Sequence, residues 1–207
     1  MQRTPLVAVL AMATIVVASN ILVQFLAGPY LTWGAFTYPF VFLVTDLTNR
    51  VYGAAAARRV VLAGFAVGVV CSLIGSRIVG DFGPLVTFRV AVGSGIAFLC
   101  ANLLDIAVFS RLRRMRWWVA PFCASVCASL LDTALFFSIA FSAAMAWIDP
   151  GADVAWAAEA VPVLGIGAVA PLWVSLAVAD GGVKLLLDGV ALVPFRMIVA
   201  KMIARIA

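Results

Sequence analysis

The chain reads TWGAFTYPFVFLVTDLTNRVYGAAAARR from Thr32 to Arg59, and this stretch decides the fold because it places charges inside an apolar run. Asp46 and Arg50 are four residues apart, so on a helix they share a face, with Asn49 beside them. A charge at the centre of a membrane span costs roughly 2.5–3.5 kcal/mol on insertion scales, so two charges in one turn require a reason. Two interpretations remain open: an ion pair that only locks helix packing, or a polar face that lines a cavity inside a membrane bundle.

An aromatic cluster precedes these charges and contains Trp33, Phe36, Tyr38 and Phe40. Flat side chains beside hydrogen-bonding groups are suited to holding a planar heterocycle. This part of the chain is therefore a candidate site for a planar ligand.

The composition excludes a soluble globular domain. Of the 207 residues, 66% are hydrophobic and only 11% are charged, and the mean hydropathy is +1.18. Runs of about 20 apolar residues, the length that spans a bilayer as a helix, recur along the whole chain. We therefore expect an all-α polytopic membrane protein with a single domain, residues 1–207. The six expected transmembrane helices cover approximately residues 5–27, 35–54, 60–79, 85–110, 117–147 and 165–197.

The basic residues gather in short segments between these spans, where they set the orientation of the protein in the membrane. The net charge of +5 does not indicate a nucleic-acid partner, because no solvated basic domain exists to carry it. With six spans, the acidic segment from Asp149 to Glu159 falls on one side of the membrane and both termini lie in the cytoplasm. The basic positions expected on the cytoplasmic side are Arg3, Arg58, Arg59, the Arg111–Arg116 cluster, Arg196, Lys201 and Arg205.

The chain has no histidine, and this excludes a Ser-His triad and a histidine-ligated metal. Its four cysteines, Cys71, Cys100, Cys123 and Cys127, all fall inside expected spans. Thiols without histidine or a carboxylate cluster make a poor metal site, so we expect buried, small apolar side chains and neither a metal nor a cofactor.

Polar groups also occur inside other expected spans. Asn20 and Gln24 are one helical turn apart, so their amides point the same way, either to hydrogen-bond another helix or to read a ligand. Asp132 lies near the centre of the fifth span with no basic residue within a turn. It must find a partner on another helix, take up a proton, or face water or ligand. Asp180 and Lys184 form a second acid-before-base pair at helical spacing.

Carboxylates outnumber cations among the deeper ionisable residues. Such an interior favours a cation, a proton, or a neutral molecule that aims donor groups at a carboxylate. A guanine-like edge, with a ring N–H beside an exocyclic amine, fits one carboxylate with two hydrogen bonds. The deeper residues are Asp46, Asp105, Asp132, Asp180 and Asp188 against Arg50 and Lys184.

Two further predictions concern the fourth span. Arg89 lies near one end and is expected to extend toward the headgroups. Asp105 lies near the other end, where a solvated position is reasonable.

Four segments resemble the queuosine precursor transporters, the vitamin uptake transporter family of bacterial inner-membrane proteins. The segments are LTWGAFTYPFVFLVTDLTNRVYG, LLDIAVFSRLRRMRWWVAP, LLDTALFFSIAF and ADGGVKLLL. The resemblance covers about residues 19–59 and 88–141, with a shorter block around Asp180. It implies import of 7-cyano-7-deazaguanine, 7-aminomethyl-7-deazaguanine or both into the cytoplasm, and no enzymatic activity.

With this resemblance, we expect secondary transport with alternating access by the six-helix bundle. The base would stack on Trp33, Phe36 or Tyr38, and Asp46 or Asp132 would accept its donor edge or the aminomethyl cation. Asn20 and Gln24 would read the edges of the base, and the two acid-before-base pairs would rearrange during transport. The candidate substrate-binding residues are Asn20, Gln24, Trp33, Phe36, Tyr38, Asp46, Asn49, Arg50, Asp132, Asp180 and Lys184.

Two alternatives come from other classes. One is a substrate-capturing subunit of an energy-coupling-factor importer, although the first span lacks the Ala-x-x-x-Ala pair that such subunits use for docking. The other is an intramembrane aspartyl enzyme using Asp105 and Asp132. The expected partners are a small-molecule base and the lipid bilayer, with no nucleic acid, and a homo-oligomer is left open.

Overall fold

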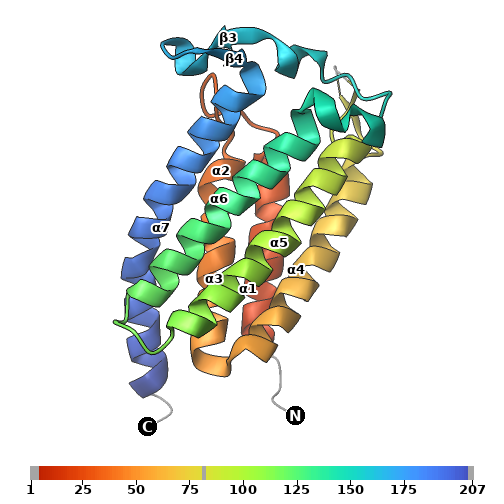
Figure 1. Cartoon of the computed structure of the whole chain (residues 1–207). Coiled ribbons are helices and arrows are strands. Elements are labelled where there is room, and N and C mark those ends of the chain that lie inside the picture. Colours follow the sequence, from red (N-terminus) through yellow and green to blue (C-terminus); the bar gives the residue numbers. More distant parts are fainter. Residues whose placement is uncertain (1–4, 81–82, 205–207) are drawn as a thin grey trace.

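In the computed structural model, which describes residues 5–80 and 83–204, long helices run side by side along a common axis (Figure 1). The chain is mostly helical, as the composition predicts. The helices are α1 (Leu6–Leu22), α2 (Gly34–Thr37), α3 (Pro39–Tyr52), α4 (Ala54–Gly75), α5 (Phe88–Leu112), α6 (Val119–Phe141) and α7 (Leu172–Ala204).

The two ends of the bundle differ in charge. Both chain termini, the α3–α4 junction and the α5–α6 loop lie at one end in Figure 1. The basic residues Arg58 and Arg59 stand in the first turns of α4, and residues 113–116 form part of the α5–α6 loop. The grouping of basic segments expected from the sequence is therefore present in the described part of the chain. Arg3 and Arg205 lie outside the described residues.

Three helices in the described residues are long and apolar enough to cross a membrane, namely α4, α5 and α6. The 17 residues of α1 are apolar but span only about 26 Å, somewhat less than a hydrocarbon core of about 30 Å. α3 has 14 residues, and the 33-residue α7 carries several charges along its length. Length and hydropathy thus identify three of the six expected spans.

A break at Tyr38 separates α2 from α3. Pro39 has no N–H to donate to the preceding turn, so the regular hydrogen-bond ladder is interrupted there. Tyr38 itself keeps helical dihedral angles, with φ of −60° and ψ of −39°. The expected span at residues 35–54 is therefore a nearly continuous helix from Gly34 to Tyr52 whose local interruption falls at Tyr38.

α1 packs closely against α4 because α4 has a glycine at the contact. A Cβ atom added at Gly64 would lie 2.6 Å from Cγ of Met12, a distance that side chains cannot tolerate. The core around this contact also joins α3 and α5. Its buried residues are Met12, Val16, Val41, Ala57, Val60, Val61, Phe98 and Ile106.

The end opposite the termini is covered by the segment between α6 and α7 (Figure 1). This segment contains three 3₁₀ helices, Ala143–Ile148, Ala155–Ala158 and Val163–Gly165, and an antiparallel pair, β3 (Ala160–Pro162) with β4 (Val169–Pro171). A second pair, β1 (Val79–Gly80) with β2 (Gly83–Pro84), follows α4. The α-helix of the expected span 117–147 consequently ends at Phe141. Neither strand pair was expected, because an all-α fold was predicted.

The four cysteines lie within helices, as expected, but none of them is buried. Cys100 and Cys127 are exposed on the outside of the bundle, and Cys71 and Cys123 are partly exposed. The expectation of buried thiols is wrong because the neighbouring helices leave two of the cysteines exposed and cover the other two only in part.

Arg89 does not extend toward the headgroups, as the sequence suggested. Its side chain is 1% exposed and turns inward across the end of α6. The Nε atom donates to the carbonyl oxygen of Ile139 at 2.6 Å, and Nη2 donates to the carbonyl oxygen of Ser142. The guanidinium therefore satisfies carbonyl groups that the helix end leaves free and lies where the helix dipole favours a cation.

Replacing Arg89 with Leu is expected to lower stability by about 2–4 kcal/mol, because two buried carbonyl groups lose their donor. Thermal unfolding of the detergent-purified protein measures the effect. The matched control is Arg77→Leu, since Arg77 is exposed in the loop after α4. Equal melting temperatures for the two variants would contradict a capping role for Arg89.

Candidate functional site

A buried lysine on α7 is held between two carboxylates. Lys184 is 4% exposed, and its Nζ atom lies 2.8 Å from Oδ2 of Asp132 on α6. The same atom lies 2.6 Å from Oδ2 of Asp180, one turn earlier on α7. The acid-before-base spacing of Asp180 and Lys184 therefore does produce an ion pair. The partner that Asp132 was expected to find on another helix is Lys184.

Two further side chains complete this group. Thr133 Oγ1 donates to Oδ2 of Asp180 at 2.9 Å and accepts from Lys184 Nζ at 3.4 Å. The ring of Tyr38 lies beside the ammonium, with 4.9 Å between Nζ and the ring centroid. We call this group the lysine centre: Tyr38, Asp132, Thr133, Asp180 and Lys184.

The lysine centre has one cation for two carboxylates. Burying charges is expensive unless each is paired and hydrogen-bonded, and Lys184 supplies ammonium donors to both acids. One carboxylate nevertheless remains in excess if both are ionised. The site is thus suited to a ligand that brings hydrogen-bond donors or a positive charge, and Tyr38 offers an aromatic face next to it.

A second group of buried acids comes from α3, α5 and α7. Asp46 on α3, Asp105 on α5 and Asp188 on α7 are 2%, 0% and 2% exposed. We call these three residues the carboxylate cluster. Ser125 donates to Oδ2 of Asp46 at 3.3 Å, and Ser129 donates to Oδ2 of Asp188 at 2.8 Å.

Several oxygens of the carboxylate cluster receive no hydrogen bond from an N–H or O–H group. They are Asp46 Oδ1, both carboxylate oxygens of Asp105, and Asp188 Oδ1. The carboxyl groups of Asp46 and Asp105 face each other closely enough to hydrogen-bond when one of them carries a proton. Buried polar atoms are almost always paired, so this concentration of unpaired oxygens indicates a site with a missing partner.

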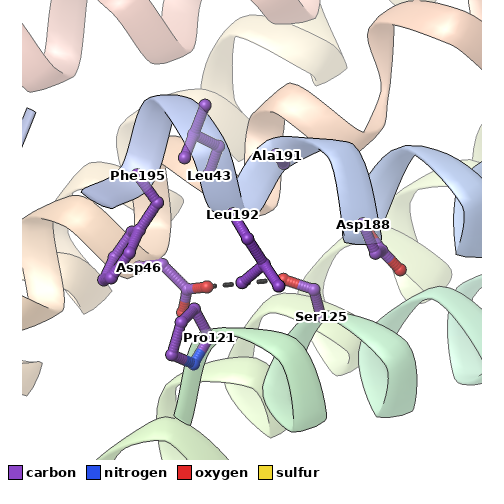
Figure 2. A pocket seen from close by; sticks show the side chains of 8 residues that line it. All are labelled: Leu43, Asp46, Pro121, Ser125, Asp188, Ala191, Leu192 and Phe195. Atoms are coloured by element: carbon purple, nitrogen blue, oxygen red, sulfur yellow. Dashed lines mark hydrogen bonds between the residues drawn. The ribbon is translucent and has the colours of Figure 1, made fainter. Parts of the chain in front are cut away.

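Asp46 and Asp188 also line a small pocket between α3, α6 and α7 (Figure 2). Its interior has room for about one water molecule. The other walls are mostly apolar. The lining residues are Leu43, Asp46, Pro121, Ser125, Asp188, Ala191, Leu192 and Phe195.

The expected Asp46–Arg50 ion pair is not formed. Asp46 points into the bundle toward Ser125, as Figure 2 shows. Arg50 instead donates to the carbonyl oxygen of Arg113 at 2.9 Å, and Arg113 donates back to the carbonyl oxygen of Arg50 at 2.6 Å. Partners on other elements therefore outcompete the local pair, because the interior offers donors to Asp46 and the α5–α6 loop offers acceptors to Arg50.

Asn49 and the two amides of the first helix lie outside both groups. Asn49 donates to the carbonyl oxygen of Ile106 at 3.3 Å and thereby joins α3 to α5. Asn20 donates to the carbonyl oxygen of Val16 within its own helix at 2.9 Å. Gln24 is exposed in a turn beyond Leu22, where α1 ends, so the expected shared face of Asn20 and Gln24 is not formed.

The aromatic candidates for stacking also lie partly inside and partly outside the lysine centre. Trp33 is 51% exposed, and its ring centroid lies 5.6 Å from that of Phe36, on the α2 side of the break. Tyr38 alone among the three candidates for stacking reaches the lysine centre. The structure thus brings Tyr38, Asp132, Asp180 and Lys184 together, and it places Asp46 in the neighbouring cluster.

The sequence-based candidates omitted Asp105 and Asp188. Asp105 was expected to be solvated, yet it is fully buried, on a helix that packs against α3, α4 and α6. A signal for Asp188 was present, since it follows Lys184 by four residues on the same helix face. Asp105 faces Asp46 and Asp132 pairs with Lys184, so the aspartyl dyad considered above is not formed.

Neither group has the arrangement of a metal site. Within residues 5–80 and 83–204, no set of three or more His, Cys, Asp or Glu side chains is placed to hold a metal ion.

Comparisons with known proteins identify relatives. Residues 32–199 match the sequence model of a family described as "Putative vitamin uptake transporter". The chain is 33% identical over 205 residues to the queuosine precursor transporter of Escherichia coli strain K12, covering 92% of this chain and 84% of that protein. It is 36% identical over 121 residues to a probable queuosine precursor transporter of Haemophilus influenzae, covering 53% and 52%. No solved structure matches.

Replacing Lys184 with Met is expected to cost about 3–5 kcal/mol of stability, because two buried carboxylates lose their cation. Adding Asp132→Asn to that variant is expected to restore part of the loss, since one of the unpaired charges is then removed. Thermal unfolding in detergent measures both effects. The matched control is Lys201→Met, at the exposed end of α7. A double variant no more stable than the single one would contradict the pairing.

Proposed function

We propose that this chain, which belongs to the vitamin uptake transporter family, imports queuosine precursors into the cytoplasm. Family membership and the names of the relatives make it a membrane transporter. We propose 7-cyano-7-deazaguanine, 7-aminomethyl-7-deazaguanine or both as its substrates. The observation that carries this proposal is the lysine centre: a buried excess of carboxylate beside an aromatic face, inside a helix bundle.

The chemistry of the lysine centre is complementary to a deazaguanine. The ring N–H and the exocyclic amine of the base would donate to one carboxylate in parallel. Asp132 is the better candidate, because it lies beside both Tyr38 and Lys184, whereas Asp46 lies in the neighbouring cluster. The ammonium of Lys184 would donate to the ring carbonyl, and Tyr38 would stack on the base. Asp180 would remain available for the aminomethyl cation.

We further propose that six helices span the membrane: α1, α2 with α3, α4, α5, α6 and α7. The grouping of Arg58, Arg59 and the α5–α6 loop at the end that carries both termini supports a cytoplasmic location for that end. Trp117 stacks on Arg196 there, with 4.9 Å from Cζ to the ring centroid, which suits the headgroup layer. The membrane would be the bacterial inner membrane.

The proposed mechanism is alternating access. Lys184 on α7 currently binds Asp132 on α6, so this ion pair joins the two helices. A substrate that donates to the carboxylate oxygens of Asp132 in place of Lys184 would release the lysine and loosen the contact between α6 and α7. Movement of α7 relative to α6 would then expose the site to one side of the membrane or the other.

Replacing Asp132 with Asn should weaken binding of 7-cyano-7-deazaguanine by about 10–100-fold, because a charged acceptor of two hydrogen bonds is lost. Titration of the detergent-purified protein with both deazaguanines, guanine and queuine, by calorimetry or thermal shift, measures this. The control variant is Glu159→Gln, an exposed acid in the α6–α7 segment that should bind like the wild type.

Two results would count against the proposal. One is a folded wild-type protein that binds none of the four bases. The other is an Asp132→Asn variant that binds the deazaguanines as tightly as the wild type does. The group that accepts hydrogen bonds from the base would then lie outside the lysine centre.

A further inference from the structure

The ion pairs of the described residues include none with the carboxylate cluster. Its three acids come from three helices and are at most 2% exposed. The nearest cation is Lys184, one turn from Asp188 on α7, and its ammonium is already held by Asp132 and Asp180. Burying three ionised carboxylates together without a counter-ion would be prohibitively unfavourable.

The surroundings supply no other compensating charge. Asp105 and Asp188 face Asp46 from α5 and α7, and the groups contributed by α6 are the neutral hydroxyls of Ser125 and Ser129. The described part of α1 and α2 contains no charged residue. On α4 the charged residues are Arg58 and Arg59, which are exposed at the end of the bundle.

The contact between Asp46 and Asp105 requires a proton. Two carboxylates in direct contact repel each other strongly at low dielectric, and one proton converts that repulsion into a hydrogen bond. The unpaired oxygens of Asp46 and Asp105 are the atoms that such a proton would join. A metal ion is a poorer explanation, since no metal-binding arrangement exists in the described residues.

The pocket lies to one side of the lysine centre along the bundle axis. Its lining residues precede the lysine centre on α6 and follow it on α3 and α7. On each helix that direction leads toward the end with the basic segments (Figure 1). The carboxylate cluster therefore lies between the lysine centre and the end proposed to be cytoplasmic, with a water-sized space beside Asp46 and Asp188.

We infer that the carboxylate cluster of Asp46, Asp105 and Asp188 is a proton-binding site whose loading and release drive transport. A proton from the outer side would add to the Asp46–Asp105 pair, and the same proton would leave to water on the cytoplasmic side. Asp188 lies one turn after Lys184 on α7, so movement of α7 at the lysine centre also changes the cluster. The inference that the proton drives transport rests on the proposed function, whereas the inference that a proton is bound does not.

Infrared spectroscopy of the protein in lipid nanodiscs tests the bound proton without any substrate. The wild type should show the C=O stretch of a buried protonated carboxyl group at about neutral pH, where exposed acids are ionised. Asp105→Asn and Asp46→Asn should each remove that signal, and Glu159→Gln should keep it. Absence of the signal in the wild type, or its persistence in both cluster variants, would overturn the inference.

Transport in proteoliposomes tests the coupling. With the membrane potential clamped to zero, one unit of acid-outside pH gradient should drive about tenfold accumulation of 7-cyano-7-deazaguanine, if one proton enters per neutral base. Asp105→Asn should abolish this accumulation.

Exchange of labelled for unlabelled base without a gradient measures transport alone. If labelled base exchanges but the pH gradient drives no accumulation, the coupling of transport to protons is overturned and the proposed function remains intact. Absence of exchange for both deazaguanines would contradict the proposed function, and the infrared result would then decide the proton site by itself.

Discussion

The ion pairs of Lys184 are the interaction on which the rest of the structure depends. A buried ammonium must stay within reach of its acids, so the contact of Lys184 with Asp132 fixes how α7 lies against α6. The hydrogen bond from Thr133 to Asp180 joins the same two helices. That position in turn brings Tyr38 beside the ammonium and Asp188 beside Ser129. A single cation therefore sets both the packing of two helices and the chemistry of the bundle interior.

The two polar groups divide the work that transport requires. The lysine centre offers donors, acceptors and an aromatic face to a ligand, while the carboxylate cluster offers unpaired carboxylate oxygens and a water-sized space. They are joined through α7, where Lys184 and Asp188 occupy successive turns of one face. A movement that separates Lys184 from its acids necessarily alters the neighbouring cluster. In the proposed mechanism, binding of substrate and binding of a proton are thus linked by one helix.

The sequence predicted the helical class and the Asp180–Lys184 pair, because both follow from local spacing and composition. It did not predict the partner of Asp46, since helical spacing to Arg50 says nothing about donors on other helices. The burial of Asp105 depends on which helices cover its face, and one chain's periodicity does not contain that information. The prediction that Gln24 shares a helix face with Asn20 was wrong for a local reason. α1 ends before Gln24, and apolar composition alone does not mark where a helix ends.

The most direct test exchanges the charges at the lysine centre. In the double variant Asp132→Lys with Lys184→Asp, one base still lies between two acids, so the account predicts a melting temperature near that of the wild type. The carboxylate that would accept the donor edge of the base nevertheless moves from α6 to α7. 7-Cyano-7-deazaguanine should therefore no longer raise that melting temperature. A variant that remains stabilised by this base would contradict the assignment of the lysine centre as the substrate site. A variant as unstable as Lys184→Met alone would contradict the ion pairing itself.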